Sequence, residues 1–238
     1  MEAARPNDES TLFRTYAVPF VLFLGFNLLL WAVEMHYKWD HPSAPWYQRM
    51  PELWVYALQV AACGGYLAAV RRHVEWDFKL APCLWGAAAG TVGIGLWLIP
   101  YFTGWIPAEG GFEPERIFGD NTTALAAAYA CRFARAVVIV PFVEELFWRG
   151  YLMRRCVNND FPHTVPLGQA TWLSYAVVTA AFMLVHRPCD YAGALVYGTL
   201  TFLLVVKTRR LMPAVVMHAV ANLIMGLCAV TYNLPHLW

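Results

Sequence analysis

The stretch that decides the fold is LAPCLWGAAAGTVGIGLWLIPYF, residues 80–102, in which no position carries a charged side chain. A helix needs about 20 apolar residues to cross the hydrocarbon of a bilayer, so this stretch predicts a transmembrane helix. Small residues let helices approach one another closely in a membrane. Because Gly90, Gly93 and Gly95 lie in this stretch, we expect the helix to pack tightly against a neighbour.

The composition of the whole chain agrees with a membrane protein. Of its 238 residues, 59% are hydrophobic and 14% are charged. A soluble domain is typically about 45–50% apolar and about 25% charged. The formal net charge is only +1, which gives no field to attract nucleic acid. We therefore expect the lipid bilayer, and no nucleic acid, as a partner.

Further apolar runs predict the remaining spans. They cover residues 16–35, 53–70, 136–154, 171–186, 191–206 and 211–232. With 80–102 they make seven spans of an all-α, polytopic transmembrane helix bundle. We expect a polar N-terminal tail over residues 1–15 and a single transmembrane helical domain over 16–238.

The helical pattern around the fourth of these spans is longer than one crossing. Residues 122–155 read as helix throughout, which corresponds to about 50 Å at about 1.5 Å per residue. We expect the first part, with Arg132 and Arg135, to lie at the interface, while 136–154 crosses. If the segment from Thr122 inserts by itself, the chain has an eighth span.

The distribution of basic residues favours one orientation of the bundle in the membrane. They follow the second, fourth and sixth spans, at Arg71, Arg72, Lys79, Arg154, Arg155, Lys207, Arg209 and Arg210. Because cytoplasmic loops are enriched in Lys and Arg, we expect a cytoplasmic N-terminus and an external C-terminus. Arg132 and Arg135 count against this orientation, since they would begin a span on the outer side. The expected location is a bacterial inner membrane.

Two adjacent carboxylates lie inside the fourth span, in the stretch PFVEELFWRG, residues 141–150. Residues i and i+4 share a helix face, so Glu145 is expected to pair with Arg149. Glu144 points about 100° away on the helix and has Trp148 as its i+4 neighbour, which cannot neutralise it. The two glutamates therefore have different environments, and we expect different roles for them.

Two further spans contribute polar side chains in the same i, i+4 spacing. Phe182 and His186 form one pair, and His218 and Asn222 form the other. Each pair alone is typical of a structural hydrogen bond between helices. Together with Glu144 they supply a base, two imidazoles and an amide, which are the groups that hydrolysis requires.

The depths of these groups set a condition on the fold. Glu144 lies about 15 Å and His218 about 10 Å from the basic end of their spans, at about 1.5 Å per residue. His186 meets them only if the fifth span stops inside the bundle, where Arg187 and Pro188 break the helix. Irregular backbone at such a depth must line a cavity. We expect a water-filled pocket that opens toward the cytoplasmic side.

The three groups resemble the motifs of the CPBP family, the CAAX proteases and bacteriocin-processing enzymes also called Abi. These motifs are Glu-Glu-x-x-x-Arg, Phe-x-x-x-His and His-x-x-x-Asn, and they stand in that order here at 144–149, 182–186 and 218–222. The resemblance covers residues 136–227 and looks most like the bacterial branch called CAAX prenyl protease-related proteins.

The resemblance implies an intramembrane endopeptidase of the glutamic type, which acts on membrane-associated protein or peptide substrates without a cofactor. It implies that Glu144 and His186 activate the attacking water, and that His218 and Asn222 stabilise the oxyanion. Glu145 and Arg149 would orient the site, and Phe182 would line it.

Two other functions stay open at this point. In a zinc protease, Glu144, His186 and His218 would be the metal ligands, with water in the fourth position. In a non-catalytic immunity or scaffold protein, the motifs would form a polar network that holds the bundle together. The physiological substrate, the need for a prenyl group and the oligomeric state do not follow from the sequence.

Overall fold

The computed structural model describes residues 8–107 and 110–237, and these residues contain helices and no strand. The α-helices are α1 (Glu9–Tyr16), α2 (Val18–His36), α3 (Trp46–Arg49), α4 (Glu52–Val70), α5 (Leu80–Phe102), α6 (Glu115–Phe118), α7 (Thr122–Phe133), α8 (Val140–Glu145), α9 (Met153–Val157), α10 (Trp172–Leu184), α11 (Tyr191–Thr208) and α12 (Met212–Thr231). Six helical runs are long and apolar enough to cross a membrane. The predicted all-α, polytopic fold is therefore confirmed.

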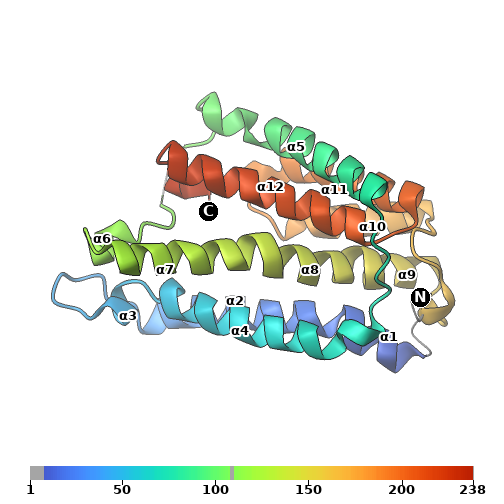
Figure 1. The fold of residues 1–238 in the computed structure, drawn as a ribbon, viewed down its shortest axis with the longest axis horizontal. Coiled ribbons are helices and arrows are strands. Elements are labelled where there is room, and N and C mark those ends of the chain that lie inside the picture. Colours follow the sequence, from blue (N-terminus) through green and yellow to red (C-terminus); the bar gives the residue numbers. More distant parts are fainter. Residues whose placement is uncertain (1–7, 108–109, 238) are drawn as a thin grey trace.

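The centre of the molecule is one long helical run. Helices α7, α8 and α9 join through π-helical turns at Ala134–Ile139 and Leu146–Leu152 into a continuous helix of 36 residues, Thr122–Val157. Figure 1 shows it along the whole length of the bundle. The expectation that residues 122–155 are helical throughout is confirmed. Arg135, which the sequence places at the membrane interface, donates hydrogen bonds to Gln59 of α4 and Asn27 of α2.

Helices α2 and α4 pack together on one side of the central run, while α5, α11 and α12 lie on the other (Figure 1). Among the described residues, the most extensive contact between two helices joins α5 to α12. A Cβ atom added to Gly86 would lie 2.2 Å from the carbonyl oxygen of Pro213, and one added to Gly90 would lie 2.4 Å from that of Met217. The predicted tight packing of α5 is thus present, although Gly95 takes no part in it because it faces open space.

The hairpin of α10 and α11 turns around inside the bundle. With 13 residues, α10 is about 20 Å long at about 1.5 Å per residue, which is short of a bilayer's hydrocarbon core. A capping box between Thr171 and Ser174 fixes its start. After α10 ends at Leu184, a short turn with a 3₁₀ segment at Pro188–Asp190 leads directly into α11. The expectation that the fifth span stops within the bundle is confirmed.

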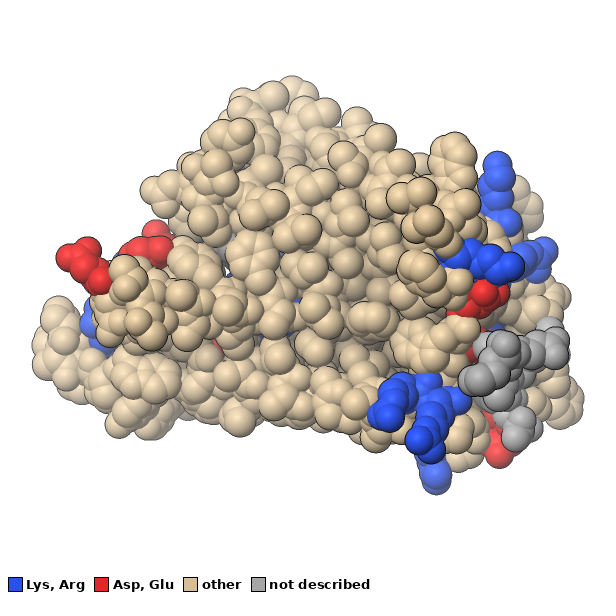
Figure 2. Space-filling model, in the orientation of Figure 1, with Lys and Arg blue, Asp and Glu red and all other residues tan. Residues whose placement is uncertain are grey.

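Charged residues gather at the two ends of the bundle. Figure 2 shows clusters of Lys and Arg side chains, with some Asp and Glu among them, at the end where α9 and α1 lie, and further Asp and Glu side chains at the α6 end. The first end also holds ion pairs of Arg154 with Glu75 and of Arg210 with Asp77. Within the expected polar tail, residues 1–7 lie outside the described part, while α1 packs Leu12 and Tyr16 into the protein.

Candidate active site

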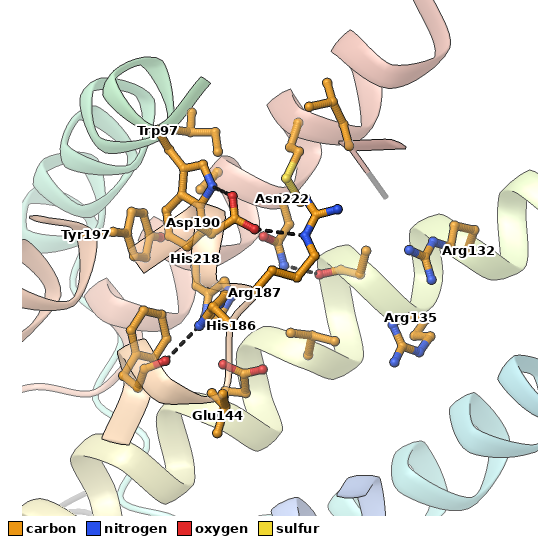
Figure 3. Close-up of a pocket in the computed structure, with 18 of the residues that line it drawn as sticks. Trp97, Arg132, Arg135, Glu144, His186, Arg187, Asp190, Tyr197, His218 and Asn222 are labelled. Carbon is orange, nitrogen blue, oxygen red and sulfur yellow. Dashed lines mark hydrogen bonds and ion pairs between the residues drawn. The ribbon is translucent and has the colours of Figure 1, made fainter. Parts of the chain in front are cut away.

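The polar motifs of three helices meet at one cavity of about 390 Å³. Glu144 from α8, His186 from the turn after α10, and His218 and Asn222 from α12 all line it (Figure 3). Phe182 lines it as well, whereas Glu145 and Arg149 are fully buried behind its wall. The structure thus brings together the side chains that the sequence places far apart.

The two adjacent glutamates have different surroundings. Glu144 faces the cavity, where Nε1 of Trp148 donates a hydrogen bond to its Oε2 over 3.3 Å. Glu145 has no exposed surface and pairs with Nη1 of Arg149 at 3.1 Å, as its i+4 spacing predicts. It also lies 3.0 Å from Nδ1 of His218, a contact between helices that the sequence did not indicate.

The ring of His186 is fixed by the end of its own helix. Its Nδ1 lies 2.7 Å from the carbonyl oxygen of Phe182. A carbonyl oxygen only accepts hydrogen bonds, so Nδ1 must carry the proton and Nε2 of the neutral ring is an acceptor. The ring also packs edge to face against Trp97 at 5.2 Å between centroids. His186 therefore has an available nitrogen lone pair on a ring that lines the cavity.

His218 and Asn222 are held by polar contacts on one face of α12. The contact with Glu145 occupies Nδ1 of His218 and leaves Nε2 available to the cavity. Nδ2 of Asn222 donates to the carbonyl oxygen of Ala136 over 2.7 Å. Ala136 lies in a π-helical turn, where the backbone departs from the regular α pattern. An amide NH₂ has two donors, so this contact leaves Asn222 one further hydrogen to donate.

A cluster around Asp190 holds the turn that carries His186. Asp190 accepts hydrogen bonds from Nε1 of Trp97 at 3.0 Å and from the hydroxyl of Tyr101 at 2.5 Å. Nε of Arg187 donates to its other oxygen over 3.0 Å (Figure 3). The sequence treats Arg187 only as a helix breaker and misses the cluster. The sequence pattern that points to this cluster is the i, i+4 spacing of Trp97 and Tyr101 on α5, which places both side chains on one helix face.

Tyr197 is a further cavity residue that the sequence did not single out. It comes from α11 and is only 3% exposed, with its ring 6.0 Å from that of His218. Among the described residues, its buried hydroxyl has no hydrogen-bond partner. The hydroxyl is therefore available to a water molecule or a substrate group. The sequence alone does not indicate that this tyrosine, within an apolar helix, lines a cavity with its hydroxyl available.

The cavity extends along the axis of the bundle. From Glu144 its lining runs along the central helix to Arg135 and Arg132, toward the α6 end of the bundle. On the basic side of Glu144, Trp148 and Phe182 are buried. The opening toward the cytoplasmic side stays a prediction. The sequence gives depths along single helices, but it does not show which aromatic side chains fill the space on either side.

The residues proposed as zinc ligands do not form a ligand set in this arrangement. Within residues 8–107 and 110–237, no three His, Cys, Asp or Glu side chains converge in a way that would hold a metal ion. We therefore derive no reaction step through a metal.

The fold and the site define a class: a polytopic helical membrane protein with acid–base side chains gathered in a cavity within the bundle. Residues 126–224 match the family model described as type II CAAX prenyl endopeptidase Rce1-like. The chain thus carries an Rce1-like domain, which confirms the resemblance to the CPBP family over this part of the chain and indicates a CAAX protease-type enzyme. Searches of the curated proteins and of the solved structures found no match.

Proposed function

We propose that this cavity hydrolyses a peptide bond of a membrane-associated protein or peptide, using a water molecule held by Glu144 and His186. The observation that carries the proposal is the convergence of polar side chains from three separate helices on one cavity inside an apolar bundle. Ionisable groups at such depth are costly in a membrane and are therefore associated with function. The Rce1-like match supports the same class of reaction.

The first step is activation of the water. A water molecule between Glu144 and His186 donates one hydrogen bond to the carboxylate and one to Nε2 of the imidazole, whose lone pair is available. As the water oxygen attacks the carbonyl carbon, its proton moves to Glu144. General-base catalysis of this kind typically contributes about 10²–10⁴-fold in rate. The same proton then passes to the leaving nitrogen as the C–N bond breaks, which yields a carboxylic acid and an amine.

The second requirement is stabilisation of the negative oxygen of the tetrahedral intermediate. The donors that we assign to this oxygen are the second amide hydrogen of Asn222 and Nε2–H of a doubly protonated His218, because the Nδ1 hydrogen of His218 is already donated to Glu145. Losing one such donor typically slows an enzyme by about 10²–10³-fold. Glu145 and Arg149 act as positioning residues in this scheme, because Glu145 bonds both Arg149 and His218. Phe182 packs against the His186 ring at 4.6 Å between centroids.

The test is cleavage by the full-length protein reconstituted in lipid nanodiscs. The probe is an S-farnesylated peptide that ends in Cys-Val-Ile-Met, with both products identified by mass spectrometry. We expect the variant Glu144→Gln to lose at least about 10²-fold in kcat, since an amide is no general base. The matched control is Glu34→Gln, which changes a carboxylate that lies outside the cavity and pairs with Lys38 at 3.6 Å.

Unchanged cleavage by the Glu144→Gln protein would rule out the proposed role of this carboxylate. Equal losses in the Glu34→Gln control would point to a general effect on folding instead. The zinc alternative is tested on the same preparation. Activity that depends on a stoichiometric metal and disappears with a chelator would favour it over the glutamic mechanism.

The chain is an integral membrane protein by its six apolar helices and its family. We further propose that it lies in a bacterial inner membrane with the basic end of the bundle in the cytoplasm, following the positive-inside rule. In this orientation the cavity extends from Glu144 toward the external side, since Arg135 and Arg132 precede Glu144 on a helix that runs toward the basic end.

A further inference from the structure

Tyr197 lies in the wall of the cavity, where close packing holds its ring (Figure 3). The ring is edge to face with those of Trp97 and His218, at 6.0 Å between centroids in each case, and it stacks on Phe182 at 6.3 Å. On the side of α5, a Cβ atom added to Gly93 would lie 2.9 Å from Cδ2 of Tyr197, so the absence of a side chain there makes room for the ring. Groups from α5, α10 and α12 thus fix the position of this tyrosine.

The packing leaves the hydroxyl of Tyr197 without a hydrogen bond. The residue is only 3% exposed, and among the described residues no donor or acceptor contacts its hydroxyl oxygen. Tyr101, which lines the same cavity, differs in this respect because its hydroxyl donates to Asp190 over 2.5 Å. A buried polar group that makes no hydrogen bond destabilises a protein. The unused donor of Tyr197 is therefore suited to an acceptor that arrives with the substrate.

The charged groups around Tyr197 place its side chain beside the three motifs. It interacts electrostatically with both adjacent glutamates, Glu145 and Glu144, and with Arg149. The neighbouring ring of His218 already uses its Nδ1 hydrogen in the contact with Glu145, so it offers a second hydrogen only when it is doubly protonated. A phenol, in contrast, carries its hydrogen at any pH near neutrality. Tyr197 is thus a donor whose availability does not depend on the protonation of His218.

We propose that Tyr197 is a further catalytic residue, whose hydroxyl donates a hydrogen bond to the oxyanion of the tetrahedral intermediate together with His218 and Asn222. The inference rests on the proposed function and deepens it. As the carbonyl carbon becomes tetrahedral, its oxygen takes up negative charge, and a donor that is already fixed in place needs no reorganisation at that moment. The proton stays on the phenol oxygen throughout. Because the hydrogen bond strengthens as the charge develops, it acts mainly in the transition state.

The test is the variant Tyr197→Phe, which removes the hydroxyl and keeps the ring. The full-length protein in nanodiscs is assayed on the S-farnesylated peptide ending in Cys-Val-Ile-Met. We expect kcat to fall by about 10²-fold while KM stays within about twofold, because the lost hydrogen bond acts in the transition state. The unfolding temperature should not fall, because the substrate-free protein loses no hydrogen bond.

The matched control for this loss is Tyr175→Phe. It removes a hydroxyl that lies 3.0 Å from Oγ1 of Thr199, outside the cavity, and should leave kcat unchanged. Two non-natural residues at position 197 then separate the hydroxyl from the shape of the ring. With meta-fluorotyrosine, which keeps the hydroxyl, kcat should stay near the wild-type value. With meta-fluorophenylalanine, which lacks it, kcat should fall as far as in Tyr197→Phe.

The outcomes separate this inference from the proposed function. Active wild-type protein together with unchanged kcat in Tyr197→Phe would overturn the inference alone. Equal losses for the two fluorinated residues, or a loss in Tyr197→Phe that comes with a lower unfolding temperature, would assign the tyrosine a structural role and overturn it too. A wild-type protein that does not cleave the peptide would overturn the proposed function and the inference together.

Discussion

Glu144 and Glu145 are neighbours in the chain, yet the bundle gives them different chemistry. Glu145 is wholly enclosed and connects Arg149 on its own helix with His218 on α12. Glu144 faces a cavity and receives only the indole N–H of Trp148 as a described hydrogen bond. A buried ion pair that loses one partner leaves an uncompensated charge, whereas a carboxylate in a polar cavity has no such dependence. At the residue scale, we therefore propose a positioning role for Glu145 and a reactive role for Glu144.

This contrast predicts that substitutions of the two glutamates differ in their effect on stability. We expect Glu145→Gln to lower the free energy of unfolding by about 3–5 kcal/mol, because the enclosed Arg149 then lacks its counter-charge. Glu144→Gln, the matched neighbour, should change it by less than about 1 kcal/mol. Thermal and denaturant unfolding in detergent, followed by tryptophan fluorescence, would measure both. Similar losses for the two variants would show that the difference in their surroundings has no energetic consequence.

The elements position the site through two features of the backbone. The α10–α11 hairpin reverses at the depth of Glu144 and presents His186 there, with Asp190 holding the turn to α5. Close packing of α5 on α12 sets the position of the helix that carries His218 and Asn222. The glycines of α5 therefore affect the site although none of them is polar.

A pair of glycine variants tests this packing. Gly90→Ala would bring a Cβ within 2.4 Å of the carbonyl oxygen of Met217, the residue before His218, so α5 and α12 must move apart. We expect a loss of about 1–3 kcal/mol in stability, as for other overpacked sites, together with lower proteolytic activity. Gly95→Ala on the same helix has nothing within 4 Å of the added atom and is the control. Equal stability of both variants would contradict the packing described here.

The sequence predicts the elements well and their mutual contacts poorly. Apolar runs locate the spans, and i, i+4 spacing finds the pair of Glu145 and Arg149 because both residues lie on one helix. The contacts of His218 with Glu145 and of Asn222 with Ala136 join separate helices, so no local pattern reveals them. The contacts of Arg135 are the hardest to predict from the sequence, since its partners Asn27 and Gln59 are over 70 residues away in the chain.

The molecule as a whole is asymmetric in charge along the bundle axis. Clusters of its Lys and Arg side chains lie at the end formed by α1, α9 and the connection between α4 and α5 (Figure 2). By the positive-inside rule we propose that this end is cytoplasmic. The lining of the cavity extends away from it, toward the α6 end of the bundle.

Fusions at the two ends of the chain test this orientation in a bacterial host. We expect green fluorescent protein to fluoresce when fused before residue 1, because it folds in the cytoplasm. Alkaline phosphatase should be active when fused after residue 238, because it requires an oxidising compartment. The exchanged fusions, with each reporter at the other end, are the controls. The reverse pattern would show that the bundle has the opposite orientation in the membrane, with the cavity extending from Glu144 toward the cytoplasm.

The central claim is that Glu144 and His186 act on the same water molecule, and a double-mutant cycle in kcat measures this most directly. Single variants Glu144→Gln and His186→Gln are compared with the double variant on the farnesylated peptide in nanodiscs, with unfolding measured in parallel. Residues that act as a unit show strongly non-additive losses. We predict that the double variant is no slower than the slower single variant. Losses in kcat that multiply would mean that the two side chains act independently, which would contradict the mechanism.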